Sequence, residues 1–397
     1  MHRSLKKSFL RVALSVVVVG SLLMAMVPGT ASAAVTATAV PRIVSVWGLG
    51  LLPQPQFDTG PATTKLIVTA PSTATVSVDV AAAITAIFPT AASRIAIFPQ
   101  AIRDAYAARM ASLMAVPFDW NAVLGVWTHD LGTEMAIPAP TAAVRAVAET
   151  LLFEEAVLGD VNVPVKVRLA GSSTTTTYKV KITVVDMQRA LLPGWTAVST
   201  PAPLGIDQWG AITAMGDGLS YTAAVRWDPA GQMWVNVASS YRITALDAWY
   251  VHTTGFEPMG LVFSRATTPP ASRPVFNTTK GGWAFVGSSV VRGKDSSGAD
   301  SYFEMPVNSL LASISGGYTT VVSPGESFSF TERYIYGGAE IGTHDWSFNQ
   351  DAWVYSAGDS SVPQATAGGA YWVNVSKNGQ LAGISQTPLT MTGWNPF

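Results

Sequence analysis

Two His-Asp pairs, His129-Asp130 and His344-Asp345, are the residues in this chain whose types most readily suggest chemistry. Imidazole and carboxylate groups are common zinc ligands, and a site would need several of them to converge. Adjacent residues of a strand point to opposite faces, so a dipeptide of this kind is poorly placed to hold one ion. The spacing therefore predicts no metal site.

Residues for hydrolytic catalysis do not form a recognisable pattern either. The sequence contains neither the Gly-x-Ser-x-Gly turn of many hydrolases nor the His-Glu-x-x-His helix of metalloproteases. It has no cysteine, which excludes thiolate chemistry. Glu154 and Glu155 are adjacent carboxylates, but no partner stands at a spacing that would make an acid–base pair. We therefore predict a non-enzymatic protein with no catalytic residue and no cofactor.

Two further polar patterns are weak. The stretch from Asp295 to Asp300, followed by Glu304, is rich in carboxylates but lacks the ligand spacing of an EF-hand, so it is interpreted as a polar turn. Asn277 and Asn374 each begin an Asn-x-Ser/Thr triplet, the acceptor pattern for N-glycosylation. That pattern matters only in a host that glycosylates exported proteins.

One stretch near the C-terminus, residues 332–346, collects side chains suited to ligand binding. Its aromatic and imidazole groups are Tyr334, Tyr336, His344 and Trp346. Rings of this kind can stack on a sugar or anchor a partner protein. The alternative is an ordinary long hairpin whose rings face the protein's own core, and the pattern alone does not separate the two.

The first 33 residues have the three parts of a secretory signal peptide. A basic start is followed by an apolar run from Val12 to Val27 and by the small residues Ala31-Ser32-Ala33. The alternative is an uncleaved membrane anchor, but Pro28 and the small residues favour cleavage after Ala33. No later stretch is a continuous apolar span, so we expect no membrane span in the mature chain.

Charge is scarce in this chain. Only 12% of residues are charged while 48% are hydrophobic. Without the signal segment and its four basic residues, 20 basic residues stand against 25 acidic ones, a net charge of −5. No basic run remains that would neutralise a nucleic acid backbone. The composition fits proteins that pack laterally into arrays or lie on a cell exterior, although a β-rich enzyme could share it.

Residues 34–189 are predicted to form one domain, mainly β with a helical insertion. Val163 to Val184 alternates strictly between apolar and polar residues on both sides of a Gly171 turn, which predicts an antiparallel hairpin. Strands are also expected at 65–69 and 74–80, and a helical period covers 81–158, most clearly 100–114. The closing hairpin resembles the last strands of an immunoglobulin-like sandwich.

The remainder of the chain contains two segments with the same order of aromatic landmarks. Gly194-Trp195 and Gly282-Trp283 open them, and 247–252 and 369–375 close them with a pair of aromatic residues. We therefore predict two tandem β-rich modules of sandwich or barrel type, a first module at 190–275 and a second module at 276–397. The second carries a long insertion.

The paired landmarks also carry a prediction about packing. Trp234 and Trp353 precede the closing aromatic pairs, and Tyr250 corresponds to Trp372. Because both segments keep aromatic residues at these places, we expect all four to be core residues of equivalent strands.

These landmarks resemble a repeat found at the C-termini of many exported bacterial and archaeal surface proteins. That repeat has a Gly-Trp-Asn-like opening, a lone tryptophan and a Gly-x-Tyr-Trp-Val close, although Thr196 and Ala284 stand here where it usually has asparagine. Relatives are commonly attached to adhesive, cell-surface or surface-layer domains. The resemblance implies a structural role outside the cell.

Export, low charge and tandem repeats together predict a secreted or cell-surface structural protein, with a subunit of a surface array or filament as one form. Its partners would then be proteins, including further copies of itself. The alternative is a carbohydrate-binding or adhesive module that uses the insertion in the second module, with a surface glycan as its partner.

Overall fold

The computed structural model describes residues 34–46, 64–132, 156–201, 203–264, 275–276, 282–288, 293–294, 300–301, 304–336, 339–366, 368–377 and 379–381. Over these residues the chain is mainly β, as expected from the sequence. The predicted signal peptide, Glu154 and Glu155, Asn277 and most of the Asp295–Asp300 stretch lie outside the described residues.

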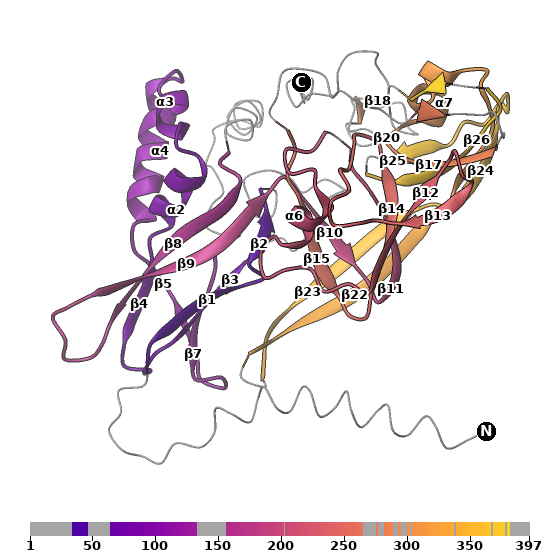
Figure 1. Cartoon of the computed structure of the whole chain (residues 1–397). Coiled ribbons are helices and arrows are strands. Elements are labelled where there is room, and N and C mark those ends of the chain that lie inside the picture. The colour runs from indigo at the N-terminus through magenta and orange to yellow at the C-terminus, as the bar shows by residue number, and fades with distance from the viewer. Residues whose placement is uncertain are drawn as a thin grey trace, which may run out of the picture.

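Two sheets make up the first part of the chain (Figure 1). One has four strands in the order β1-β3-β7-β6 and the other five in the order β2-β9-β8-β4-β5. All neighbours are antiparallel except β2 and β9, which run parallel. The strands are β1 (Thr36–Val40), β2 (Ile43–Ser45), β3 (Lys65–Thr69), β4 (Thr75–Val78), β5 (Val116–Pro117), β6 (Asp119–Asn121), β7 (Val126–Asp130), β8 (Gly159–Arg168) and β9 (Thr176–Val185).

The hairpin predicted from alternating residues is confirmed as β8 and β9. Its register pairs Val163 with Val180 and Val165 with Tyr178. Val161, Val163, Val165 and Val167 are buried, while the polar residues between them are half-buried or exposed. The alternation of apolar and polar residues therefore determines which face of this hairpin is buried.

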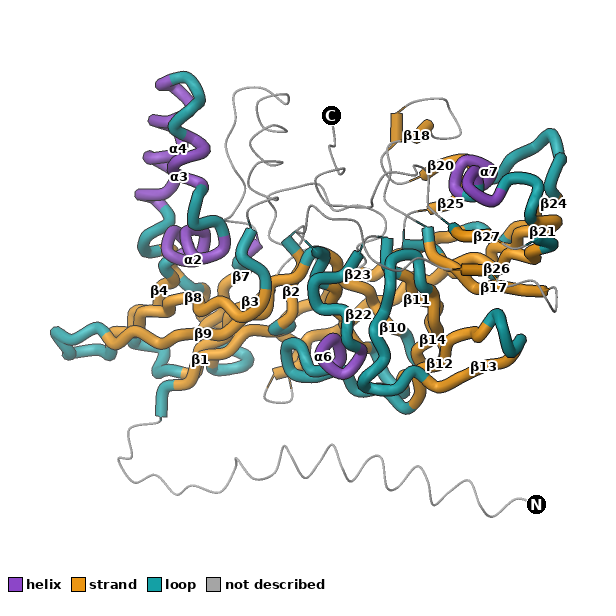
Figure 2. Tube along the Cα trace, turned by 45° about the horizontal axis from the view of Figure 1, so that its top comes forward, coloured by secondary structure: helices purple, strands orange, loops and turns teal. Residues whose placement is uncertain are grey.

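Three helices follow β4, in the region predicted to be helical. They are α2 (Val80–Ile87), α3 (Ala91–Ile95) and α4 (Gln100–Ser112), and they gather at one end of the first domain (Figure 2). The region is not helical throughout, because β5, β6 and β7 occupy part of residues 116–130. These short strands hold few residues in any one period, so the pattern did not indicate them.

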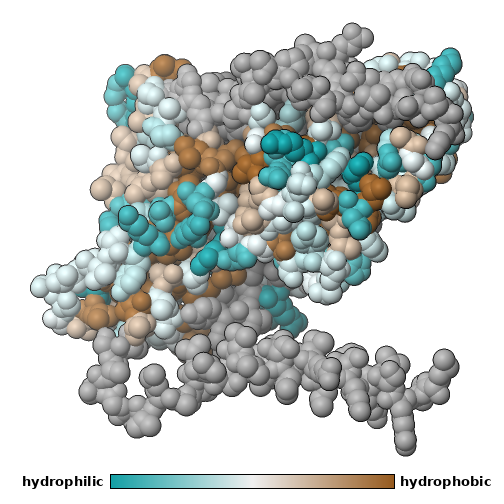
Figure 3. Space-filling model, viewed as in Figure 1, coloured by the Kyte–Doolittle hydropathy of each residue, from teal (hydrophilic) through white to brown (hydrophobic). Residues whose placement is uncertain are grey.

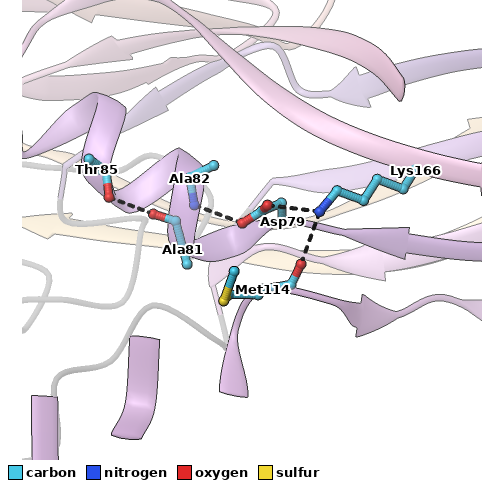
Figure 4. A network of polar contacts seen from close by, with 6 residues as sticks. All are labelled: Asp79, Ala81, Ala82, Thr85, Met114 and Lys166. Atoms are coloured by element: carbon cyan, nitrogen blue, oxygen red, sulfur yellow. Dashed lines mark hydrogen bonds and ion pairs between the residues drawn. The ribbon is translucent and has the colours of Figure 1, made fainter. Parts of the chain in front are cut away.

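Asp79 fixes the point at which strand β4 gives way to helix α2 (Figure 4). Its Oδ1 accepts a hydrogen bond from the backbone N–H of Ala82 at 2.9 Å, which caps the helix N-terminus. Its Oδ2 lies 2.9 Å from Nζ of Lys166 on β8, and the same ammonium group donates to the carbonyl of Met114 at 3.4 Å. One carboxylate thus ties the helices to the sheet.

Sheet I, the first of two similar four-stranded sheets, has the order β11-β14-β12-β13. Its strands are β11 (Gly194–Ser199), β12 (Ala223–Asp228), β13 (Met233–Asn236) and β14 (Ala248–Thr253). A separate pair, β10 (Met187–Leu191) with β15 (Glu257–Leu261), lies beside it, and helix α6 (Trp209–Thr213) packs Trp209 against Trp249 of β14.

Sheet II has the order β17-β26-β21-β24, in which each strand takes the place of its counterpart in sheet I. Its strands are β17 (Gly282–Gly287), β21 (Tyr318–Ser323), β24 (Trp353–Ser356) and β26 (Ala370–Val375). Around it lie α7 (Val307–Leu310), the 3-10 turn η3 (Ala312–Ile314) and the paired strands β16 (Val275–Phe276) with β27 (Gly379–Gln380), β18 (Gly293–Lys294) with β19 (Asp300–Ser301), β20 (Glu304–Pro306) with β25 (Gln364–Thr366), and β22 (Glu326–Tyr336) with β23 (Ala339–Gln350).

One apolar core runs without a break from the first two sheets into sheet I. It includes Val184 at the end of β9, Leu191 of β10 and Leu261 of β15, all of them fully buried. Asp186 lies between β9 and β10, which belong to different sheets. Its Oδ2 accepts a buried hydrogen bond from the backbone N–H of Phe263 at 2.6 Å. A boundary near residue 189 stays a prediction, and the packing across it is continuous.

Candidate functional site

The four predicted ligand residues lie on the β22–β23 hairpin, the long orange ribbon in the lower centre of Figure 1. The register pairs Tyr334 with Gly342 and Tyr336 with Ala339, and it sets His344 and Trp346 opposite Glu332 and Phe330. By strand parity, all four predicted positions share one face of the ribbon. Their side chains lie outside the described part of the structure, so their role as ligand contacts stays a prediction.

The opposite face of that hairpin is open to solvent. Thr331, Arg333, Glu340 and Thr343 are all exposed. Arg333 Nε lies 3.6 Å from Glu340 Oε2, an exposed ion pair across the two strands. A bulge between Tyr334 and Ile335 shifts the register just before these strands meet. The two faces of the ribbon therefore differ in composition, one carrying polar side chains and the other the positions of the predicted aromatic residues.

Of the two His-Asp pairs, only His129-Asp130 has side chains in the described part of the structure, and these two point to different partners. His129 is buried on β7 with its ring 5.4 Å from Phe118, while Asp130 points to Lys65, 3.9 Å from its ammonium nitrogen. In the described part of the chain, no three histidine, aspartate or glutamate side chains are grouped closely enough to hold a metal ion.

The most developed cluster of side chains lies where sheets I and II face one another. Phe285 of β17 lies between rings from both sheets: its centroid is 4.9 Å from Tyr250 of β14, with parallel planes, and 4.7 Å from Trp372 of β26. Trp227 and Trp234 of sheet I are arranged edge to face with Trp372, with ring centroids 5.4 and 5.5 Å apart. We call these five rings the aromatic joint.

The joint has this close spacing because the strands beneath it carry small residues. Ala248 and Ala370 are buried against Phe285, and Gly287 stands opposite Ser199. A Cβ atom at Gly287 would lie 2.7 Å from the Cβ of Ser199, so only glycine permits this approach. The backbone N–H of Gly287 also donates to the carbonyl of Leu246 at 2.7 Å, which links the two sheets directly.

A second set of hydrogen bonds is made to the backbone of Trp283 of β17. The Trp227 indole N–H donates to its carbonyl at 2.7 Å. The Gln232 side chain brackets the same residue, accepting from its N–H and donating to its carbonyl, each at 2.9 Å. Both polar ends of the Gln232 amide are therefore used to hold sheet II against the turn between β12 and β13.

An open pocket of about 350 Å³ lies at the edge of the joint. We call it the aromatic pocket. Figure 2 shows the strands that border it, β12 and β13 on one side and β17, β21 and β26 on the other. The lining is apolar and comes from both sheets: Trp227, Trp234, Trp283, Val322 and Trp372.

The expectation that Trp234 is a core residue is wrong. Its side chain is 43% exposed at the rim of the pocket, and Tyr250, Trp353 and Trp372 are half-buried. The fully buried rings are their neighbours, Trp249 and Tyr371.

The register explains the error. Trp234 pairs with Trp227, whereas Trp353 pairs with Ser323 and stacks on buried Tyr371 at 5.5 Å. When the sheets are matched on Val225 and Val322, which pair with Tyr250 and Trp372, Trp353 falls at the position of Val235. The landmarks are one residue out of step, and a one-residue slip turns a side chain to the opposite face.

Asp247, which precedes β14, carries the strongest electrostatic feature near the joint. Burial raises the pKa of its carboxyl group, against the lowering effect of hydrogen bonds from the backbone N–H of Thr244 at 2.7 Å and the hydroxyl of Tyr241 at 3.1 Å. The same burial, with the nearby Asp247 charge, raises the pKa of Tyr241. The pair is held by structural hydrogen bonds and faces no pocket residue.

Sequence reasoning found Trp234 and Trp372 as landmarks but missed Trp227, Phe285 and the site they build. The Gly-Trp openings did contain a signal, because Trp283 and Phe285 alternate along one strand and share its face. That this face meets a second sheet depends on long-range packing.

Comparison with protein-family models gave no match, and a search of curated proteins gave none. In the described part of the chain no helix has the length and apolar character needed to cross a membrane.

Proposed function

We propose that this chain is an exported, non-catalytic structural protein of the cell surface, in which sheets I and II act as one rigid unit. The observation that carries the proposal is the aromatic joint, which fastens the two sheets through stacked rings and backbone hydrogen bonds. Aromatic pairs of this geometry stabilise packing beyond the area they bury. A rigid pair of sheets is what a subunit needs if it is to transmit contacts through an array or filament.

The surface supports the same proposal. Figure 3 shows hydrophobic and hydrophilic residues interspersed over the described face, with brown areas gathered below the helices. Exposed large apolar residues include Ile97, Val123, Trp195 and Val354. The low share of charged residues supports contact with neighbouring molecules, because solubility as a free species relies on surface charge.

The layout proposed here is an immunoglobulin-like domain followed by two copies of one module. In support, the orders β1-β3-β7-β6 and β2-β9-β8-β4-β5 follow the two-sheet pattern of immunoglobulin domains, with α2 to α4 inserted between β4 and β5. The identical strand orders of sheets I and II support a duplication. The proposed domain limits remain 34–189, 190–275 and 276–397, after a signal peptide at 1–33.

Labelled antibody on intact cells tests the location, and size-exclusion chromatography with electron microscopy of residues 34–397 tests assembly. We expect surface labelling and concentration-dependent assembly into sheets or filaments. A protein found only in the medium or inside cells, or one that stays monomeric at high concentration, would contradict the proposal.

A second candidate function, binding of a surface glycan or adhesion through the β22–β23 hairpin, is favoured by the shared face of its four predicted positions. Binding to a glycan array that weakens in Tyr336→Ala and Trp346→Ala would support it. Arg333→Ala, on the opposite face, is the matched control and should leave binding unchanged. An array without hits, or hits indifferent to all three substitutions, removes this candidate.

A further inference from the structure

The aromatic pocket has a lining that offers hydrogen-bond donors but no acceptor side chain. Four of its five residues are tryptophans, whose indole group donates and does not accept, and the fifth is Val322. No lining side chain is charged. The Gln232 side chain, which holds Trp283, already uses its amide on Trp283 and Pro229. A ligand for this pocket therefore has to supply acceptors and apolar surface.

Three of the four indole groups are available for such a ligand. The N–H of Trp227 is taken by the carbonyl of Trp283. Over the described residues, no acceptor engages the indole N–H of Trp234, Trp283 or Trp372, and these rings are exposed or half-buried. None of these three indole nitrogens is among the buried polar atoms without a partner, so solvent can reach them and the acceptors of a ligand could take the place of water.

The walls of the pocket are also held in place before any ligand arrives. Trp227 and Gln232 fasten β17 to sheet I, and Trp372 is held by stacking on Phe285 and by an edge-to-face contact with Trp234. A pocket whose groups are already ordered loses less entropy on binding than one that must form around its ligand.

We propose that the aromatic pocket binds a proline-rich segment of a partner protein in the polyproline II conformation. Such a segment has the required chemistry: its rings are apolar and rigid, its carbonyl groups are unpaired acceptors, and its prolines have no N–H that would need an acceptor. Aromatic-lined grooves are the usual receptors for it. A volume of about 350 Å³ is at the small end for ligand pockets and suits one or two proline rings.

A sugar fits these observations less well. Sugar hydroxyl groups are donors as well as acceptors, and the donors would find no acceptor side chain in this lining. The inference goes beyond the proposed structural function, because it uses a different site from the β22–β23 hairpin and does not depend on array assembly.

Isothermal titration calorimetry of residues 34–397 with a capped oligoproline peptide tests the proposal. An alanine-glycine peptide of equal length and cellohexaose serve as the comparison probes. We expect saturable binding of oligoproline alone. Trp234→Ala should weaken it at least about tenfold, as for a central aromatic contact. Trp234→Phe keeps a ring but removes the hydrogen-bond donor, so its affinity for oligoproline should lie between those of the parent chain and Trp234→Ala.

Trp195→Ala is the matched control, because Trp195 is another exposed tryptophan of sheet I, 53% exposed, that does not line the pocket. It should bind oligoproline as the parent chain does. Near-ultraviolet circular dichroism checks that each variant is folded. The proposal is overturned by a folded parent chain that does not bind oligoproline, by equal weakening in Trp234→Ala and Trp195→Ala, or by binding of cellohexaose in its place.

Discussion

Sheets I and II have the same strand order but use their tryptophans differently. In both, the central strand buries one ring completely, Trp249 in β14 and Tyr371 in β26, and turns the next ring toward the joint. At the edge strand they diverge, because Trp234 faces the joint and Trp353 stacks on Tyr371. A shared topology thus preserves the faces of the central strands, while a short edge strand can exchange its outward residue for an inward one.

This difference explains where the pocket lies. Sheet I turns Trp227 and Trp234 toward sheet II, but at the corresponding edge sheet II offers Val322 and the exposed Val354. The short side chain of Val322 cannot fill the space between the tryptophan rings of the two sheets. The gap between them is the aromatic pocket.

The largest loss of stability is expected on removing the buried ring from the central strand of each sheet. Trp249→Ala and Tyr371→Ala should each lower the free energy of unfolding by about 3–5 kcal/mol, since each removes a fully buried ring. Chemical denaturation monitored by circular dichroism measures both. Similar losses support equivalent positions, whereas a loss below about 1 kcal/mol in either would show that its ring is not part of a core.

The edge strands β13 and β24 should differ in how much their tryptophans contribute to stability. Trp353→Ala should cost about 1–3 kcal/mol because its half-buried ring packs on Tyr371, and Trp234→Ala should stay within about 1 kcal/mol because 43% of its surface is exposed. The same denaturation experiment compares the pair. A larger loss of stability in Trp234→Ala than in Trp353→Ala would instead support the expectation from the sequence that Trp234 is a core residue.

The smallest effect concerns pH. Because burial raises the folded-state pKa of Asp247 above its unfolded value of about 4, its neutral form is favoured on folding. Its contribution to stability is present below the unfolded pKa and is lost as pH rises through the folded one. Asp247→Asn, which cannot ionise, should therefore reduce the fall in stability over this range. An unchanged slope would mean that other groups cause it.

Much of the β architecture was readable from the sequence, because strict alternation such as that of Val163, Val165 and Val167 has one structural meaning. Helix α4 was found for the same reason, through its 3.6-residue period. Strands β5 and β6 were missed, since two or three residues are too few to show a period, and the sequence of β7, V-W-T-H-D, does not alternate between apolar and polar residues.

The candidate site was harder to predict. The sequence marked Trp234 and Trp372 as important but not the faces they take, because a face depends on register and register depends on pairing with β12 and β21. The contact between Tyr250 and Phe285 joins the two sheets face to face. No local pattern carries that information, since each strand would look the same with its outer face in water.

Hydrogen exchange of Phe285→Ala, compared with the parent chain by mass spectrometry, tests most directly whether the joint makes sheets I and II one unit. Phe285 belongs to sheet II but stacks on Tyr250 of sheet I. If the joint couples the sheets, amides of Ala248–Thr253 in β14 should lose protection together with those of Gly282–Gly287 in β17. Faster exchange confined to sheet II, with β14 as protected as before, would contradict the coupling.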